Sequence, residues 1–273
     1  AYDVFKLDIP DIEGTALTDI PSVDLQIKDI SLSDGNLGNI IISNDIFSFI
    51  FSTEKGLPVS FIYKGEEMLA GDIKPNFWRA PTLNDDVDRN ALPKWLNASL
   101  NELTVKPAYW HADKTDGSHA FIKVNLELVN NRGEVVIVVE QVYEINGFGD
   151  VVISNNIQAS DRVTTLPKIG TQFQMPLKFN KVRYFGTDTE NYPDRNSSGK
   201  TNVYAKNARD FFELHEEPQD NGNHSETRWL ALTSEEGFGM FVTSDELFNF
   251  SIYQYSDKNL SVAERINQME KTD

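Results

Sequence analysis

The segment Ile122-Lys123-Val124-Asn125-Leu126-Glu127-Leu128 places an apolar side chain at every second position. Successive side chains of a β-strand point to opposite faces, so this alternation predicts a strand with one face buried and the other in solvent. The run Asn130-Asn131-Arg132-Gly133 follows and is typical of a turn, and a β-branched run then extends from Val135 to Val139. Together these segments predict two antiparallel strands joined by a short turn.

The same pattern continues along most of the chain. Gly147-Phe148-Gly149-Asp150 predicts a second turn, which leads into the apolar run Val151-Val152-Ile153-Ser154. Helical periodicity is scarce and is confined to a turn or two within 92–100 and to 257–268. Further strand-like runs occupy residues 182–185, 229–233, 239–243 and 248–253. We therefore predict an all-β, large antiparallel fold with few short helices.

The first 24 residues differ from the rest. Residues 1–9 alternate like a strand, whereas residues 10–24 contain Gly14, Pro21 and several acidic residues with little periodicity. We expect residues 1–9 to be the last strand of a preceding domain, residues 10–24 to be a linker, and residues 25–273 to form one large β domain.

Composition excludes several classes of partner. The chain has 25 Lys and Arg residues against 42 Asp and Glu residues, a net charge of −17, which repels phosphate backbones and anionic lipid. Apolar runs fall short of the roughly 18 residues that cross a membrane. We expect no nucleic acid and no membrane partner. The absence of cysteine excludes disulfides and thiol nucleophiles, and it leaves the compartment open between cytoplasm and periplasm.

A first polar segment, residues 75–86, interrupts the alternation. Two prolines bracket an aromatic pair and Arg79, and Asn84, Asp85 and Asp86 follow. The prolines restrict the loop, which can hold Arg79 against a carboxylate. These four residues are candidates for ligand binding; an Arg–Asp pair that only ties down the loop is the alternative.

A second polar segment, residues 184–195, follows a predicted strand that ends at Gly186. It presents carboxylate, amide, phenol and guanidinium groups close together, which suits the hydroxyls and the apolar face of a neutral sugar. A hydrogen-bonded turn is the alternative. The candidates are Glu190, Asn191, Tyr192, Asp194 and Arg195.

A third polar segment, residues 215–224, holds His215, His224 and paired carboxylates. Histidine beside carboxylates occurs in metal sites and in acid–base catalysis, but the spacing does not match a helical His-Glu-x-x-His site. Pro218 and Gly222 predict a loop, so we expect both histidines to be surface or packing residues and no metal to bind. With 42 acidic residues, carboxylate pairs suited to glycoside hydrolysis arise by coincidence and carry no specific signal.

Four motifs in these regions resemble, in the same order, the C-terminal domain of glycoside hydrolase family 2 β-galactosidases. That domain is also the core of the small subunit in two-chain versions of the enzyme. Residues 190–195 match the family motif without a change, and the other three motifs resemble it closely. The four motifs are Asn76–Asp86, Ile169–Pro176, Glu190–Arg195 and Pro218–Asn223.

The resemblance implies a β-supersandwich of the galactose mutarotase-like kind, preceded at residues 1–9 by an immunoglobulin-like domain. It implies an intact enzyme that hydrolyses terminal β-D-galactosides with retention, using two Glu residues of a separate catalytic β/α barrel. No alternating strand-and-helix pattern occurs in this sequence, so we assign no catalytic residue to it. The implied partners are the barrel, galactosides and further copies in a homo-oligomer. No cofactor is expected in this chain; Mg²⁺ and Na⁺ belong mostly to other parts of the intact enzyme, with a carbonyl-bound Na⁺ near Glu217-Pro218 as a lesser option.

In the family this domain borders the substrate pocket in two places. A loop follows the Asp-Asn-Asp element, here Asn84-Asp85-Asp86, and a tryptophan near the C-terminus stacks on the sugar. The sequence has no counterpart of that tryptophan segment before Asp273, so we expect the domain to be truncated at its C-terminus.

We therefore predict a non-catalytic, pocket-lining domain that is inactive alone and carries an apolar face for its partner. One alternative is a mutarotase-like aldose epimerase that would use His215 or His224; another is a carbohydrate-binding or structural module. The predicted substrate-binding residues are Arg79, Asn84, Asp85, Asp86, Glu190, Asn191, Tyr192, Asp194, Arg195 and Asn221.

Overall fold

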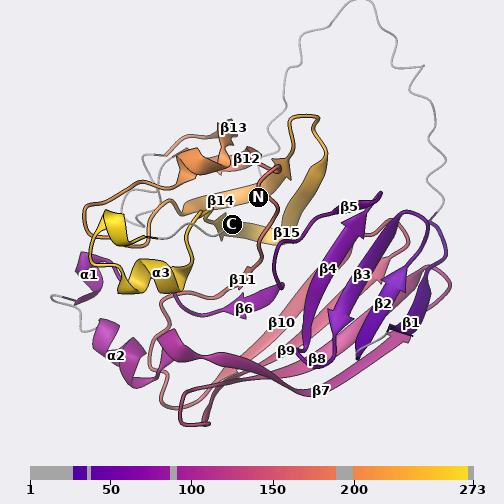
Figure 1. Cartoon of the computed structure of the whole chain (residues 1–273), viewed down its shortest axis with the longest axis horizontal. Helices are drawn as coiled ribbons and strands as arrows, with labels where there is room; N and C mark the ends of the chain where they lie inside the picture. The colour runs from indigo at the N-terminus through magenta and orange to yellow at the C-terminus, as the bar shows by residue number, and fades with distance from the viewer. Residues whose placement is uncertain (1–26, 36–37, 87–90, 189–198, 270–273) are drawn as a thin grey trace, which may run out of the picture.

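The computed structural model describes residues 27–35, 38–86, 91–188 and 199–269. Within these ranges the chain is mostly β and its strands form four antiparallel sheets (Figure 1). The prediction of a large antiparallel β protein with few short helices is thereby confirmed. The strand expected at residues 1–9 and the linker expected at residues 10–24 lie outside the described residues.

Two of the sheets are simple meanders. The first contains β1 (Ser31–Gly35), β2 (Asn39–Ser43), β3 (Phe47–Ser52), β4 (Leu57–Tyr63) and the short β5 (Glu66–Glu67) in sequence order. The second contains β7 (Thr104–Lys114), β8 (His119–Val129), β9 (Val135–Asn146) and β10 (Val151–Ala159), also in sequence order. Figure 1 shows the two sheets face to face.

The alternation in β8 produces the core between these sheets. Ile122, Val124 and Leu126 are inaccessible to solvent, and the residues between them are only partly buried. Opposite them, the rings of Phe49 and Phe51 lie 6.1 and 6.0 Å from the ring of Tyr143 in β9. Aromatic pairs at this distance stabilise a core beyond the area they bury. The face-to-face packing therefore follows from the period-two pattern of the strands.

The phenol of Tyr143 brings a polar group into this core, where it is paired. Its hydroxyl donates to Gln141 Oε1 at 2.9 Å, and Gln141 Nε2 donates to Asn155 Oδ1 at 2.7 Å. Burial also raises the pKa of Tyr143, which keeps the phenol neutral. The pairing avoids the cost of leaving a buried donor unsatisfied.

A glycine allows the two sheets to approach closely. Gly56, in the β3–β4 turn, has φ +69°, and a Cβ there would lie 2.7 Å from Pro107 Cβ and 2.8 Å from Leu126 Cδ2. Only glycine combines this backbone conformation with the space available.

Most of the remaining described residues form a second unit beside the sandwich. β6 (Lys74–Asn76) pairs with β11 (Gly170–Gln172), and a four-stranded sheet has the order β13-β12-β14-β15. A smaller core of six buried residues, with Tyr184 at its centre, covers one face of the four-stranded sheet. Its strands are β12 (Lys181–Thr187), β13 (Thr201–Asn207), β14 (His224–Thr233) and β15 (Gly239–Phe250).

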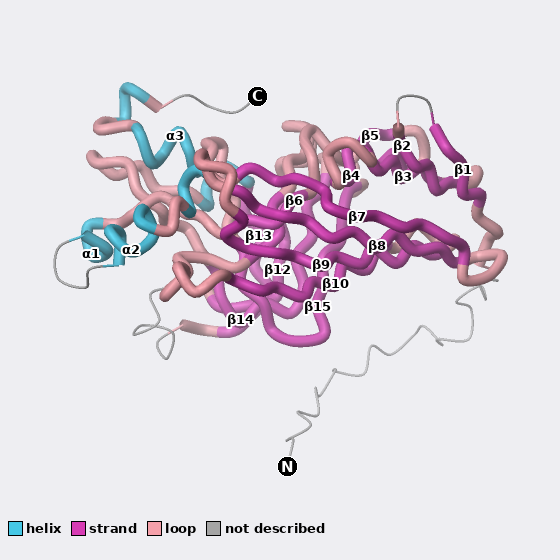
Figure 2. The backbone as a smooth tube through the Cα atoms, turned by 90° about the horizontal axis from the view of Figure 1, so that it is seen from below, coloured by secondary structure: helices cyan, strands magenta, loops and turns pink. Residues whose placement is uncertain are grey.

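The helices are short and gather at one end of the molecule, away from β1–β5 (Figure 2). They are α1 (Leu83–Asp86), α2 (Ala91–Asn97) and α3 (Asp257–Val262). The helix predicted at 257–268 is interrupted: α3 ends at Val262 and a single 3₁₀ turn follows at Ile266–Gln268. The separate strands predicted at 239–243 and 248–253 are parts of one strand, β15, which ends at Phe250, so residues 251–253 lie outside it. None of the helices in the described ranges has the length and apolar character needed to cross a bilayer.

We expect removal of a buried ring and removal of an exposed ring to have different effects on the free energy of unfolding. Phe49→Ala should lower the free energy of unfolding by about 3–5 kcal/mol, because it removes a fully buried ring and leaves a cavity. Phe241→Ala, at a ring that is 65% exposed, should change it by less than about 0.5 kcal/mol. Urea denaturation followed by tryptophan fluorescence measures both; equal losses would contradict the assignment of the core.

Candidate functional site

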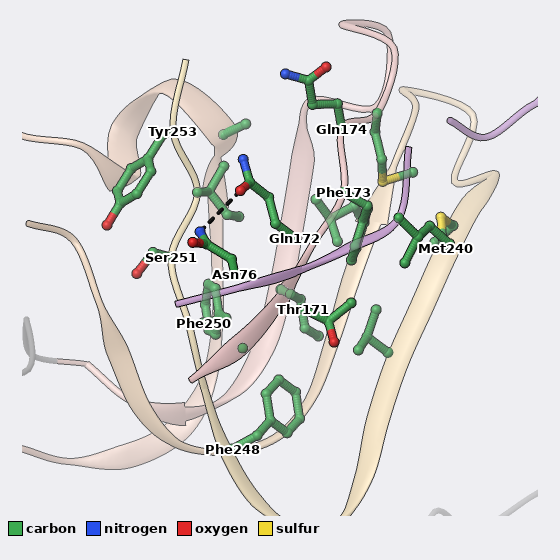
Figure 3. A pocket seen from close by; sticks show the side chains of 18 of the residues that line it. Asn76, Thr171, Gln172, Phe173, Gln174, Met240, Phe248, Phe250, Ser251 and Tyr253 are labelled. Atoms are coloured by element: carbon green, nitrogen blue, oxygen red, sulfur yellow. Dashed lines mark hydrogen bonds between the residues drawn. The ribbon is translucent and has the colours of Figure 1, made fainter. Parts of the chain in front are cut away.

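A groove of about 2280 Å³ separates the sandwich from the second unit. It is lined by β6, β11, the start of β10, the inner face of the β14–β15 hairpin and the segment that leads from β15 into α3. Figure 3 shows Asn76, Gln172, Ser251 and Tyr253 on one side of it and Phe173 and Met240 on the other. We call the part with Asn76, Gln172, Ser251 and Tyr253 the polar end of the groove. The part with Phe173 and Met240 is its apolar stretch.

Asn76 joins three elements at the polar end. Its Nδ2 donates to Gln172 Oε1 at 3.0 Å and to Asp257 Oδ2 at 2.7 Å (Figure 3 shows the first bond). Asn76 and Gln172 come together because β6 and β11 pair in antiparallel register. Asp257 is the first residue of α3, whose N-cap is Ser256. The amide of Asn76 thus contacts a residue that lies 181 positions away in the sequence.

Asp220 and Tyr253 form a carboxylate–phenol pair beside it. Tyr253 donates its hydroxyl to Asp220 Oδ1 at 2.5 Å. Burial raises the pKa of Asp220, while the bond from Tyr253 and the charges of Lys168 and Arg79 oppose that rise. Burial also raises the pKa of Tyr253, and the negative charges of Asp220 and Asp257 add to it. The polar end therefore concentrates acidic groups in a partly desolvated setting.

Arg79 and Asp85 form an ion pair, which we call the clasp. In the sequence analysis such a pair was the alternative to a role of these residues in ligand binding. Arg79 donates through Nη1 to Asp85 Oδ2 at 2.7 Å and through Nη2 to Asp85 Oδ1 at 2.9 Å. The backbone N–H and the hydroxyl of Thr82 each donate to Asp85 Oδ2 at 2.8 Å. Burial alone would raise the pKa of Asp85, but these bonds together hold it below its usual value. The bidentate geometry fixes the loop that precedes α1.

Two tryptophans hold this loop against its neighbours. The rings of Trp78 and Trp95 meet edge to face with centroids 6.1 Å apart, and the Arg79 guanidinium lies 5.0 Å from the Trp95 ring. Trp78 Nε1 donates to Ser261 Oγ in α3 at 2.9 Å, and Trp95 Nε1 donates to Thr165 Oγ1 at 3.2 Å. The loop position is therefore set by distant parts of the chain.

Four of the predicted site residues line this one groove: Arg79, Asn84, Asp85 and Asn221. Asn84 is exposed. Asn221 is buried, and its amide pairs with the backbone N–H and C=O of Glu213 and with the C=O of Gln219. Contact of these residues with a substrate stays a prediction. Asp86 ends α1 and its side chain is not described; Glu190, Asn191, Tyr192, Asp194 and Arg195 lie outside the described residues.

His224 is a packing residue, as the sequence predicted. Its ring is 2% exposed and lies among Tyr184, Phe211 and Phe250, with centroids 5.0–5.2 Å away. Nδ1 donates to the Gly222 carbonyl at 2.9 Å. Burial lowers the pKa of His224, so the ring is neutral. His224, at the end of the third polar segment, therefore packs against the aromatic rings of the smaller core.

Sequence reasoning missed Gln172, Tyr253 and Asp257. Gln172 lies within the motif Ile169–Pro176, which marked the segment but not this residue, whereas Tyr253 and Asp257 lie outside the four motifs and join the groove only through long-range packing. Within the described ranges, no three His, Asp or Glu side chains are grouped so that they could hold a metal ion.

Comparison with known proteins identifies what this chain is similar to. Residues 43–273 match the family described as the beta galactosidase small chain. The β-galactosidase of Priestia megaterium is 26% identical over 247 residues, which covers 88% of this chain and 23% of that protein. The β-galactosidase of Lactobacillus delbrueckii subsp. bulgaricus is 29% identical over 247 residues, which covers 86% of this chain and 23% of that protein. The chain thus spans under a quarter of the length of these relatives.

The clasp predicts a stability change that depends on pH. Asp85→Asn should lower the free energy of unfolding at pH 7 by about 2 kcal/mol, because it removes charge-assisted bonds from Arg79 and Thr82. The folded pKa of Asp85 lies below the unfolded value, so this stabilisation is present above the unfolded pKa and is lost as the pH falls through the folded one. Urea titrations of both proteins from pH 7 to pH 3 should show the difference shrinking with acid; a constant difference would refute the charge-based account.

The buried histidine predicts a second pH effect. Because the folded pKa of His224 is lowered, acid protonates it in the unfolded state first, and stability should fall as the pH drops below about 6.5. His224→Phe keeps a ring in the core and should flatten the stability profile between pH 7 and pH 5. His111→Phe, at an exposed histidine of β7, is the matched control and should leave the slope unchanged. Thermal melts across this range provide the measurement.

Proposed function

Since this chain belongs to the β-galactosidase small chain family, we propose that it is the non-catalytic part of a retaining β-galactosidase that hydrolyses terminal β-D-galactosides. In this proposal it lines one side of the substrate pocket and packs on a catalytic β/α barrel supplied by the rest of the enzyme. The observation that carries the proposal is the gathering of Arg79, Asn84, Asp85 and Asn221 along one groove, although their motifs lie over 130 residues apart in the sequence.

The chemistry of the polar end supports a lining role. Asn84 is exposed, and its amide can both donate to and accept from a sugar hydroxyl. The clasp of Arg79 and Asp85 holds the backbone of that loop in place, which limits the entropy lost when a ligand binds. Asn84 is therefore the described residue that we expect to meet the sugar.

Three carboxylates near the polar end each accept a hydrogen bond from within the chain. A retaining glycosidase needs one carboxylate free to attack and one carboxylic acid free to donate its proton. Asp85 is held by Arg79, Asp220 accepts a bond from Tyr253, and Asp257 accepts one from Asn76. Asp85, held by two bonds from Arg79, is the least suited of the three to either role, and we propose that both catalytic carboxylates lie outside the chain.

We also propose that the four sheets belong to a supersandwich of the galactose mutarotase-like kind. The two cores and the groove between them fit an architecture in which further strands complete the structure. The intact protein is proposed to be a homo-oligomer, with any Mg²⁺ and Na⁺ bound mostly by its other portions. In the mutarotase-like alternative His224 is poorly suited to acid–base chemistry, because it is enclosed by aromatic rings and its Nδ1 is bonded to a carbonyl, so that alternative would have to use His215.

An activity assay tests the proposed function. The chain alone should not hydrolyse a chromogenic β-galactoside, whereas the intact enzyme that contains it should. In the intact enzyme Asn84→Ala should raise KM about three- to tenfold and change kcat less, because one hydrogen bond to a sugar contributes about 0.5–1.5 kcal/mol.

Asn131→Ala, in the exposed turn between β8 and β9, is the matched control and should leave both constants unchanged. Hydrolysis by the chain alone, abolished by a substitution at Asp220 or Asp257, would overturn the non-catalytic assignment. Equal effects of the two asparagine substitutions would remove Asn84 from the pocket.

A further inference from the structure

Four hydrogen bonds tie the loop that precedes α1 to α3, and they form a closed ring. Asn76 Nδ2 donates to Asp257 Oδ2 at 2.7 Å, and Asn76 Oδ1 accepts from the backbone N–H of Trp78 at 2.9 Å. The indole Nε1 of Trp78 donates to Ser261 Oγ at 2.9 Å, and the Ser261 hydroxyl donates to the Asp257 carbonyl at 2.6 Å. We call these four bonds the hydrogen-bond ring.

The ring joins two segments that are far apart in the sequence. Asn76 ends β6 and Trp78 lies in the loop after it, whereas Asp257 and Ser261 both belong to α3. Residues four positions apart face the same side of a helix, so both α3 residues can meet the loop. Trp78 and Asp257 are each only 9% exposed, so water competes little for these bonds. Figure 1 and Figure 2 both show α3 at the same end of the molecule as α1.

α3 has supports of its own. Its N-cap Ser256 accepts at Oγ from the backbone N–H of Asn259 at 3.1 Å, which satisfies one of the free N–H groups of the first turn. Leu260 is 1% exposed and anchors the helix in the protein. A helix of six residues is marginal by itself, so tertiary contacts must hold α3 in place. Held in this way, α3 can support the loop.

The clasp connects the ring to the exposed end of the loop. Arg79 directly follows Trp78, and its guanidinium holds both carboxylate oxygens of Asp85, the neighbour of Asn84. Arg79 also donates to the carbonyl of Ala80 at 3.2 Å. A bidentate pair fixes orientation as well as distance. A shift of Trp78 therefore moves Arg79, and Asp85 and Asn84 move with it.

One oxygen in the ring has no partner. Asp257 Oδ1 is buried and lacks a hydrogen-bond partner among the described residues. A buried carboxylate oxygen in this state costs stability. An asparagine at this position would keep an oxygen that can accept from Asn76 and would remove the buried charge. A substitution at Asp257 can therefore separate the hydrogen bond from the charge.

We propose that Asp257 and Ser261 are positioning residues of the substrate pocket. Through the hydrogen-bond ring they fix the loop that presents Asn84 to the sugar, and neither of them touches the substrate. The inference rests on the proposed function, because it assigns to α3 the task of holding the pocket-lining loop. A loop that is fixed in advance loses less entropy when the sugar binds, so the ring raises affinity for the galactoside.

A double substitution in the intact enzyme tests the proposal. Ser261→Ala removes the acceptor of the Trp78 indole and should raise KM about two- to tenfold with a smaller change in kcat, as loss of one hydrogen bond would. With Asn84→Ala already present, Ser261→Ala should raise KM no further, because both substitutions act through the same contact with the sugar. Multiplied effects of the two substitutions, or no effect of Ser261→Ala, would overturn the proposal.

Ser31→Ala is the matched control. The Ser31 hydroxyl also donates to a backbone carbonyl, that of Ser43, but it lies in β1, away from the loop. This substitution should leave KM and kcat unchanged.

Two variants at Asp257 distinguish positioning from a general loss of stability. Asp257→Asn keeps an acceptor for Asn76 and should hold KM within about twofold of the parent enzyme. Asp257→Ala removes the acceptor and should raise KM as Ser261→Ala does. Equal KM values for the two variants would contradict the role of Asp257.

Hydrogen exchange in the same enzyme gives a readout that does not depend on activity. Ser261→Ala should speed amide exchange in peptides that cover residues 77–86 at least about fivefold, because the loop loses its tie to α3. Peptides from β8 should exchange as in the parent enzyme, which shows that the variant is folded. Unchanged exchange in residues 77–86 would also overturn the proposal. Faster exchange there, together with no effect of Asn84→Ala on KM, would count against the proposed function and not against the tie between α3 and the loop.

Discussion

The packing of Phe49 and Phe51 against Tyr143 is the interaction on which the structure depends. These rings join two meanders that have no strand pairing with each other, and they exclude water from the interior of the sandwich. The hydroxyl of Tyr143 is accommodated because Gln141 and Asn155 complete its hydrogen bonding. Without this contact each sheet would expose a row of apolar side chains to solvent.

The polar end of the groove depends on that sandwich for its position. The chain leaves the first sheet after β5, and β6, which pairs with β11, ends at Asn76 just before the loop with Arg79. The Trp78–Trp95 contact and the bond from Trp78 to Ser261 hold this loop beside α3. The result is a set of hydrogen bonds in which Asp85, Asp220 and Asp257 each accept at least one bond. Such a set is suited to shaping a surface, because little reorganisation is needed when a ligand or a neighbouring domain meets it.

The groove lies between the two units and is lined by residues of both. On one side it reaches the core of the sandwich, and on the other it reaches the smaller core around Tyr184. The proposed pocket lining lies at its polar end.

The sequence by itself determined the strand-rich class, the short helices, the turns at Asn130–Gly133 and Gly147–Asp150, and the family, because these depend on local periodicity and on motifs within a few residues. It also indicated that Arg79 could pair with a nearby acid and that His224 would pack. Only the tertiary structure decided that Asn76 meets Asp257 and that Asp220 meets Tyr253, because such contacts join residues far apart in sequence. The groove, its open strand edges and its polar end arise from how the sheets stack, and no local pattern encodes that arrangement.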